Sequence, residues 1–180
     1  DFTAEVERSL RVLDGGVVVF DGSQGVEPQS ETVWRQADKY DVPRIAFVNK
    51  MDKIGADFFM SLDSIHERLT PNGFAIQLPI GFESSFSGVV DLVEKKAYTF
   101  EGKHGEIIKE IPLPEDMTDL IEKHRRILIE KVAENNDDMT DKYLNGEEFS
   151  IEELKKGIRS AVVRGKIYPV FCGSALANRG

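Results

Sequence analysis

The tetrapeptide Asn49-Lys50-Met51-Asp52 carries residue types that can recognise a purine base. A carboxylate such as that of Asp52 can accept two parallel hydrogen bonds from the N1–H and 2-amino groups of guanine, a pair that adenine lacks. The amide of Asn49 can serve the base edge and tie neighbouring loops together. The aliphatic stem of Lys50 can lie along the flat face of the base while its ammonium stays solvated. These residue types, in this order, predict a guanine-binding segment that includes Met51.

A second segment near the end of the sequence strengthens this prediction. Gly173-Ser174-Ala175-Leu176 follows another apolar run and can offer backbone N–H groups to the 6-oxo group of guanine. The alternative for the tetrapeptide is a polar turn at a strand end, since such a short motif also arises by chance. The predicted nucleotide-binding residues are Asn49, Lys50, Met51, Asp52, Ser174, Ala175 and Leu176. No catalytic residue and no metal ligand is predicted.

The sequence has no Gly-x4-Gly-Lys-Ser/Thr loop that could cradle phosphates. The lysines Lys50, Lys53, Lys103 and Lys166 all lack the required glycine spacing. We expect the phosphate-binding loop, its Mg²⁺ ligands and the first switch to precede Asp1, in a longer protein of which this chain is an internal piece. The chain by itself is therefore expected to bind GDP weakly or not at all and to hydrolyse no GTP.

Alternating apolar patterns place these segments in an α/β fold. Short apolar runs predict strands buried on both faces, and apolar residues three or four apart predict helices. Strands are predicted at 17–20, 45–48, 75–79 and 167–171, and helices at 2–13, 28–40 and 57–69. This βαβα order favours a doubly wound, mostly parallel sheet. Ligands of such a sheet bind beyond the carboxyl ends of its strands, here after Phe20, Val48 and Phe171.

The pattern changes at about Gly81. A meander of three strands is predicted at 89–93, 97–100 and 107–111, and helices are predicted at about 114–132, 139–144 and 151–163. Ser150 and Glu153 form a capping box at the start of the last helix. We therefore predict an inserted α+β subdomain over residues 81–165. Residues 1–80 and 166–180 would form a partial nucleotide-binding domain.

The composition excludes several classes of function. The chain of 180 residues has a net charge of -9, which argues against free nucleic acid as a partner. It has no apolar run of about 20 residues, so no membrane partner is expected. The single Cys172 excludes a disulfide framework and favours a cytoplasmic protein. His66, His104 and His124 lack the spacing of metal ligands.

Acidic residues are concentrated in the predicted insertion, which has 19 acidic and 13 basic residues. Those on its first long helix are Glu115, Asp116, Asp119, Glu122, Glu130 and Glu134. They either keep this surface soluble or steer a basic patch of a partner protein toward it. The sequence leaves both interpretations open.

Several segments resemble translational GTPases, and together they span nearly the whole chain. The first segment looks like the one that follows the Asp-Thr-Pro-Gly-His switch motif of that family. The inserted segments are similar to those of elongation factor G. The matching residues are 1–10, 21–29 and 48–53 in the nucleotide-binding part, and 77–81, 86–91 and 96–98 in or next to the insertion.

This resemblance implies a P-loop NTPase-like fold and a ribosome-bound GTPase that drives translocation and, with a recycling factor, subunit splitting. The cofactor would be GTP or GDP, with Mg²⁺ only in the full-length protein, and the acidic insertion would engage the ribosomal stalk protein. Two alternatives stay open. One is a paralogous translational GTPase, mitochondrial or specialised for ribosome recycling, and the other is a stalk-binding interaction module without nucleotide.

Overall fold

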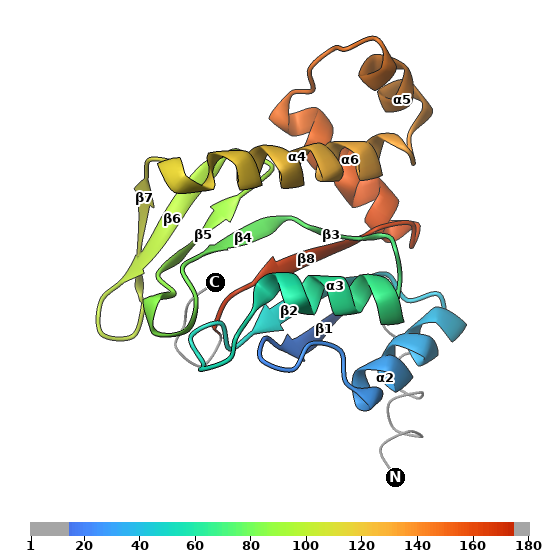
Figure 1. Cartoon of the computed structure of the whole chain (residues 1–180). Helices are drawn as coiled ribbons and strands as arrows, with labels where there is room; N and C mark the ends of the chain where they lie inside the picture. The colour runs from blue at the N-terminus through green and yellow to red at the C-terminus, as the bar shows by residue number, and fades with distance from the viewer. Residues whose placement is uncertain (1–14, 175–180) are drawn as a thin grey trace.

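The computed structural model describes residues 15–174, and residues 1–14 and 175–180 lie outside the described part. The helix predicted at 2–13 falls among the residues that are not described. The described chain forms a parallel sheet and an antiparallel sheet, together with five α-helices (Figure 1).

The first sheet is parallel and has the strand order β1-β2-β8-β3. Its strands are β1 (Gly16–Asp21), β2 (Arg44–Asn49), β3 (Gly73–Ala75) and β8 (Tyr168–Cys172). β8 pairs between β2 and β3, although the antiparallel sheet and three helices precede it in the sequence. This arrangement confirms the predicted α/β fold, and it places the carboxyl ends of β1, β2 and β8 at one edge.

The helices α2 (Pro28–Lys39) and α3 (Phe58–Arg68) pack against this sheet. α2 starts with a proline, whose missing N–H would be unpaired in the first turn anyway, and it buries Trp34 and Ala37. α3 starts after Asp57, whose side chain accepts a hydrogen bond from a backbone N–H of the first turn. The buried residues of α3 are Phe58, Ser61, Leu62 and Ile65.

The prediction that the strand at 17–20 is buried on both faces is wrong. Phe20 is buried at 1% exposure, but Val17 and Val19 are 59% and 55% exposed. β1 is the outermost strand of the described sheet, and only the face that carries Phe20 is covered. A continuous apolar run does not reveal whether one or both faces of a strand are covered by other elements. A strand covered on one face and a strand covered on both can have the same composition.

The single strand predicted at 75–79 is divided between the two sheets. β3 pairs with β8, whereas β4 (Gln77–Ile80) pairs with β5 (Gly88–Asp91) in the antiparallel sheet. Ile76, between them, donates its N–H to Val170 O at 3.1 Å and accepts from Leu92 N at 3.1 Å. The second sheet therefore begins at Gln77, ahead of the predicted start of the insertion at Gly81.

The antiparallel sheet has the order β4-β5-β6-β7 and confirms the predicted meander, with β4 as an additional strand. Its last two strands are β6 (Lys96–Glu101) and β7 (Ile107–Ile111), which pair antiparallel. A short 3-10 turn, η1 (Glu83–Ser85), lies between β4 and β5. Ile107 and Ile108 of β7 are exposed, as befits the outer strand of the sheet.

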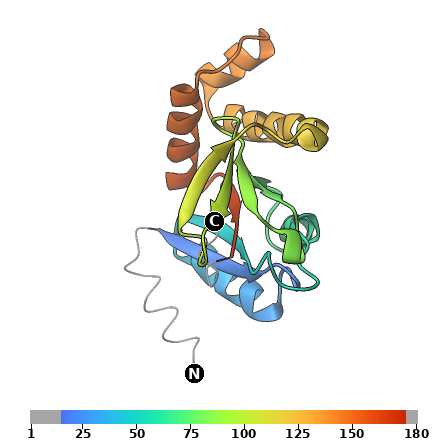
Figure 2. The same ribbon diagram turned by 90° about the vertical axis from the view of Figure 1, so that its left-hand side faces the viewer.

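Three helices complete the insertion, after the 3-10 turn η2 (Glu115–Met117). α4 (Thr118–Ala133) runs along the antiparallel sheet, and α5 (Asp137–Leu144) lies beyond the C-terminal end of α4. α6 (Ile151–Val163) crosses behind α4 and leads back to β8 (Figures 1 and 2). The predicted capping box is confirmed, because Glu153 N donates to Ser150 Oγ at 3.1 Å. All three predicted helices are present, but the first begins at Thr118 and not at about 114, since Glu115 and Asp116 lie in η2.

One apolar core joins the two sheets and their helices. At the contact between α3 and α4, the rings of Phe59 and His124 lie with their centroids 5.4 Å apart. Leu78 of β4 and Val170 of β8 belong to the same buried cluster. The insertion therefore packs directly on the parallel sheet. Within residues 15–174, no helix has the length and apolar character needed to cross a membrane.

Candidate guanine-binding site

The predicted site residues lie in loops at one edge of the parallel sheet. In the register of the sheet, Asp21 at the end of β1 lies opposite Asn49, and Val48 lies opposite Cys172. The loops after β2 and β8 therefore emerge side by side, where open parallel sheets bind their ligands. The described members of the predicted set are Asn49, Lys50, Met51, Asp52 and Ser174, while Ala175 and Leu176 lie outside the described residues.

A hydrogen bond links the two predicted segments. Ser174 Oγ donates to Asp52 Oδ1 at 2.7 Å, across 122 residues of sequence. The backbones are joined as well, since Met51 N donates to Gly173 O at 3.1 Å and Gly173 N donates to Val48 O at 3.0 Å. Ser174 is buried at 1% exposure, whereas Asp52 is exposed. The serine can thus orient the carboxylate from below while the carboxylate faces solvent.

The backbone of Asn49 connects the loop after β2 to the loop after β1. Its carbonyl oxygen accepts a hydrogen bond from Gly22 N at 2.8 Å. A Cβ at Gly22 would come within 2.9 Å of the same oxygen, so this close approach requires a glycine. Gly22 O in turn accepts from Asp57 N at 2.9 Å. The main chain at Asn49 thus connects the two loops, while the role predicted for its side-chain amide stays a prediction.

Lys50 marks the point where the chain turns sharply out of the sheet. Its φ is +60°, a left-handed conformation that is uncommon for residues other than glycine. The side chain is half exposed, and its Nζ lies 3.6 Å from Asp21 Oδ2. Such backbone strain persists where the surrounding contacts determine the conformation, which is frequent at binding sites. The stem of Lys50 is accessible to a ligand at this edge.

Met51 differs from the other predicted residues, because its side chain is fully buried. Its backbone N–H donates to Gly173 O at 3.1 Å, and its carbonyl accepts from Glu83 N at 2.9 Å. Both main-chain groups are therefore used within the protein. Met51 anchors the loop in the core and leaves the exposed groups of its neighbours to meet a ligand.

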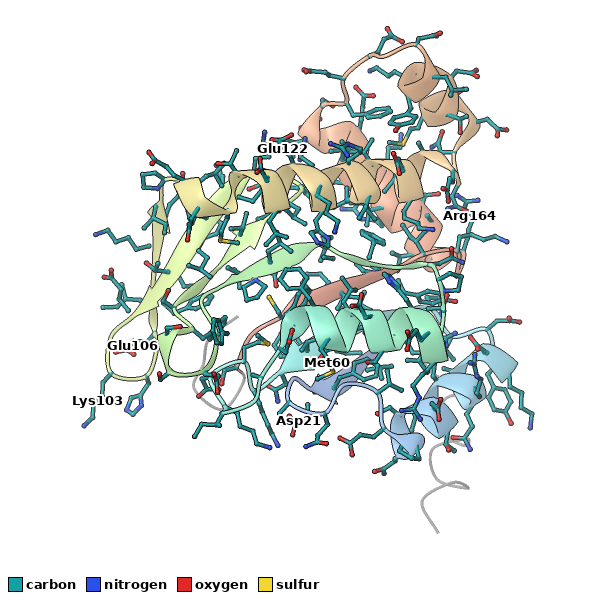
Figure 3. All side chains as sticks on the ribbon, viewed as in Figure 1. Asp21, Met60, Lys103, Glu106, Glu122 and Arg164 are labelled. Carbon is teal, nitrogen blue, oxygen red and sulfur yellow. The ribbon has the colours of Figure 1, made fainter. Side chains whose placement is uncertain are left out.

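Asp21 belongs to this site although the sequence did not single it out. Its Oδ1 accepts hydrogen bonds from Ser23 N at 2.9 Å and from Ser23 Oγ at 2.7 Å, and its Oδ2 lies 3.2 Å from Lys53 Nζ. Burial alone would raise the pKa of Asp21, but the hydrogen bonds from Ser23 and Lys53 outweigh it and lower the pKa to about 2. Figure 3 shows Asp21 at the end of β1. Its position directly after a buried run was the available signal.

Glu83 is a second residue that sequence reasoning missed. It lies in η1, at the start of the insertion, and hydrogen bonds to the loop that carries Asp52. Nothing in its local sequence pointed to that contact, because the two segments meet only through the packing of the two sheets.

Other reactive groups in the described part lie in the interior or stand apart. Cys172 is fully buried, and burial raises the pKa of its thiol, as expected for a small core residue. His66 contacts Gly73 O through Nε2 at 2.5 Å. Among the described residues, no three His, Cys, Asp or Glu side chains gather in a group that could hold a metal ion.

A parallel sheet with these loops at its carboxyl edge and an antiparallel insertion defines a P-loop GTPase-like α/β domain. The chain belongs to the family of the elongation factor Tu GTP binding domain, which matches residues 1–180, and is thus a segment of a translational GTPase. It is also similar to a Thermus thermophilus protein of known crystal structure, with a TM-score of 0.87 and 28% sequence identity. That similarity covers 99% of this chain and 26% of the Thermus chain, so the chain spans about a quarter of that protein's length.

Proposed function

We propose that this chain is the guanine-recognition part of the GTP site of an elongation factor G. The observation that carries the proposal is the hydrogen bond from buried Ser174 to exposed Asp52 at 2.7 Å. A carboxylate has about four lone-pair sites, so Asp52 can accept from Ser174 and still receive the N1–H and 2-amino groups of guanine. Membership of the elongation factor Tu GTP binding domain family supports GTP and GDP as ligands.

The neighbouring residues have distinct proposed roles. Asn49 holds the loops after β1 and β2 together and presents its amide to the base edge. Lys50, half exposed beside Asp21, covers one face of the base with its stem. Ala175 and Leu176 would offer backbone N–H groups to the 6-oxo group of guanine, because they continue the chain directly beyond Ser174.

Elongation factor G is proposed, rather than another translational GTPase, because of the insertion between β3 and β8. The segments that resemble elongation factor G in sequence lie in its antiparallel sheet, in β4, β5 and β6. The whole protein would then be a ribosome-bound GTPase that drives translocation. A mitochondrial or recycling-specialised paralogue would have the same guanine loops. A toe-printing assay of translocation, compared with a subunit-splitting assay on the full-length protein, separates these possibilities.

GTP hydrolysis is assigned to the full-length protein. The sequence of this chain contains no glycine-rich phosphate loop, so the groups that hold the phosphates and Mg²⁺ must come from elsewhere in the protein. The partners proposed are the ribosome and, through the acidic insertion, its stalk protein. Net negative charge on the insertion would steer a basic surface toward it.

The substitution Asp52→Asn in the full-length protein tests the base-reading proposal. The carboxamide offers a donor where guanine requires an acceptor, so the preference for guanine should be lost and xanthine should be favoured. Each lost hydrogen bond is expected to cost about 1–3 kcal/mol of binding. Asp138→Asn, an exposed position in the first turn of α5, is the matched control.

Calorimetry with GDP and XDP measures the outcome. Unchanged preference for GDP in the Asp52→Asn variant would overturn the assignment of this residue. A full-length protein that binds the C-terminal domain of the stalk protein but neither nucleotide would instead be an interaction module.

A further inference from the structure

Two hydrogen bonds connect the start of the insertion to the loop that carries Asp52. Glu83 N donates to Met51 O at 2.9 Å, and Gly55 N donates to Glu83 Oε2 at 2.9 Å. These contacts lie on either side of Asp52 in the sequence. We propose that Glu83 is a positioning residue for guanine binding, so that the insertion forms part of the nucleotide site. The inference rests on the guanine-binding function proposed above.

The loop around Asp52 has two supports. On the side of the parallel sheet, Ser174 Oγ binds the Asp52 carboxylate, and Met51 N binds Gly173 O. On the side of the insertion, Glu83 holds the loop before and after Asp52. A hydrogen bond from a backbone N–H to a carboxylate is stronger than one between neutral groups. Glu83 therefore limits how far the loop can move away from β8.

Met51 and Ala56 of this loop are buried in the core, and residues 52–55 between them are exposed. Its own turn is closed by Lys53 N to Lys50 O at 3.0 Å and by Ala56 N to Lys53 O at 3.1 Å. Lys53 Nζ also lies 3.2 Å from Asp21 Oδ2, and the Lys53 side chain is about half exposed. Gly55, which donates to Glu83, has a φ of +89° and no side chain of its own to pack. The carboxylate of Glu83 thus fixes the most adaptable part of the loop.

The turn that presents Glu83 is itself closely determined. Glu83 has a φ of +52°, a left-handed conformation that costs about 1–2 kcal/mol for a residue with a Cβ. Gly81 has a φ of +76°, and a Cβ there would collide with the carbonyl oxygen of Ser85. Ser85 Oγ donates to Phe82 O at 2.7 Å and accepts from Phe82 N at 3.2 Å. A glycine would suit the backbone of position 83 better, so what the glutamate adds is its side chain.

The proposal predicts faster loss of nucleotide when the carboxylate is removed. Asp52 would sample orientations in which it cannot pair with both N1–H and the 2-amino group. In the full-length protein, Glu83→Gly removes the carboxylate without adding backbone strain and should raise the dissociation rate of a fluorescent GDP analogue about tenfold. Glu83→Gln keeps an oxygen acceptor and should stay within about twofold of the parent protein.

Thermal unfolding of the nucleotide-free protein separates positioning from stability. Glu83→Gly should leave the melting temperature nearly unchanged, because relief of the left-handed strain offsets the lost hydrogen bond. Glu83→Asn is a second removal variant, since asparagine tolerates this conformation but is too short to reach Gly55. Glu148 is an exposed glutamate elsewhere in the insertion. Glu148→Ala is the control and should change neither the dissociation rate of the GDP analogue nor the melting temperature.

The outcomes distinguish this inference from the proposed function. If both removal variants release the GDP analogue at the parent rate, Glu83 has no positioning role. If Asp52→Asn switches the preference to xanthine in that same experiment, the guanine site itself still stands. If Asp52→Asn leaves the preference unchanged, the proposed function fails, whatever the Glu83 variants show.

Discussion

The carboxylate of Asp21 lies 3.2 Å from Nζ of Lys53, and this contact joins the loops that follow two adjacent parallel strands. Lys50 Nζ lies 3.6 Å from the same carboxylate oxygen. Asp21 thus has two lysines of the candidate site beside it. The sequence contains all three residues, but they become neighbours only because β1 and β2 pair in register.

We expect Asp21→Asn to lower the free energy of unfolding at neutral pH and to make that free energy depend less on pH in the acid range. The folded pKa of about 2 lies below the ordinary value of 3.8, so this carboxylate contributes stability above pH 3.8 and loses it as the pH falls through about 2. After screening by solvent, the contribution is about 1 kcal/mol. Urea unfolding at pH 7 and pH 2.5 measures it. An equal loss of stability at both pH values would contradict the ionic role, and Glu67→Gln on the exposed side of α3 is the control.

His124 predicts a second pH dependence, at the contact between the insertion and the parallel sheet. Burial lowers its pKa to about 4 from 6.5, with the positive charge of Lys123 in the same direction; Asp63 opposes the shift and His66 adds to it. The folded protein therefore holds this imidazole neutral. The free energy of unfolding should be highest above pH 6.5 and should fall as the pH drops from 6.5 toward 4. In that range the unfolded protein binds a proton at His124, and the folded protein binds it only near pH 4.

His124→Leu tests this prediction because leucine fills a similar volume and cannot be protonated. Between pH 7 and pH 4.5, the parent protein should lose about 1–3 kcal/mol more unfolding free energy than the variant. Denaturant unfolding at several pH values gives the difference. Parallel pH curves for the two proteins would show that His124 is not the responsible group.

Glu122 and Glu130 of α4, together with Glu134 at its C-terminal end, are expected to speed the proposed association with the stalk protein. Reversal of Glu122, Glu130 and Glu134 to lysine is expected to slow association several-fold at low salt and less at high salt, because screening shortens the reach of the field. Figure 3 shows Glu122 on the side of α4 that faces away from the sheets. Stopped-flow association rates at two salt concentrations measure the effect.

These glutamates also have partners within the protein, so the control must remove their charge without repelling those partners. Glu122 pairs with Lys95 at 3.0 Å, and Glu130 accepts from Tyr143 Oη at 2.7 Å. Substitution to glutamine removes the charges without adding repulsion to these contacts, each of which is worth about 0–1 kcal/mol. An intermediate rate for the triple glutamine variant supports steering. If neither the triple lysine variant nor the triple glutamine variant changes the association rate, these side chains only keep the surface soluble.

The isolated chain should not turn over GTP. The phosphate loop that would hold the triphosphate and Mg²⁺ is absent from its sequence, so nothing stabilises the charge that develops during hydrolysis. Phosphate release by the purified chain, compared with the full-length protein at equal concentration, is the measurement. Sustained release that scales with the concentration of the isolated chain would contradict the prediction.

From the sequence alone, the described helices and most of the strands could be predicted, and two segments could be proposed for guanine binding. These features are local, because apolar spacing, caps and a tetrapeptide after a strand need no knowledge of distant residues. The spacing of apolar residues predicted the helix at 57–69, which is α3, and the capping box at Ser150 predicted the start of α6. The order of elements was enough to predict a parallel sheet with an insertion.

Only the tertiary structure decided which strands pair and which loops meet. It divided the run around Ile76 between two sheets and left Val17 and Val19 exposed. It also placed Glu83 against the loop that carries Asp52. Which strands pair, and which faces of a strand are covered, depends on residues far apart in the chain. A local apolar pattern does not identify the strand or helix that will pack against it. The residues proposed to read the base, and Ser174 which binds Asp52, could therefore be named from the sequence, whereas the contacts of Glu83 and Asp21 with their loops could not.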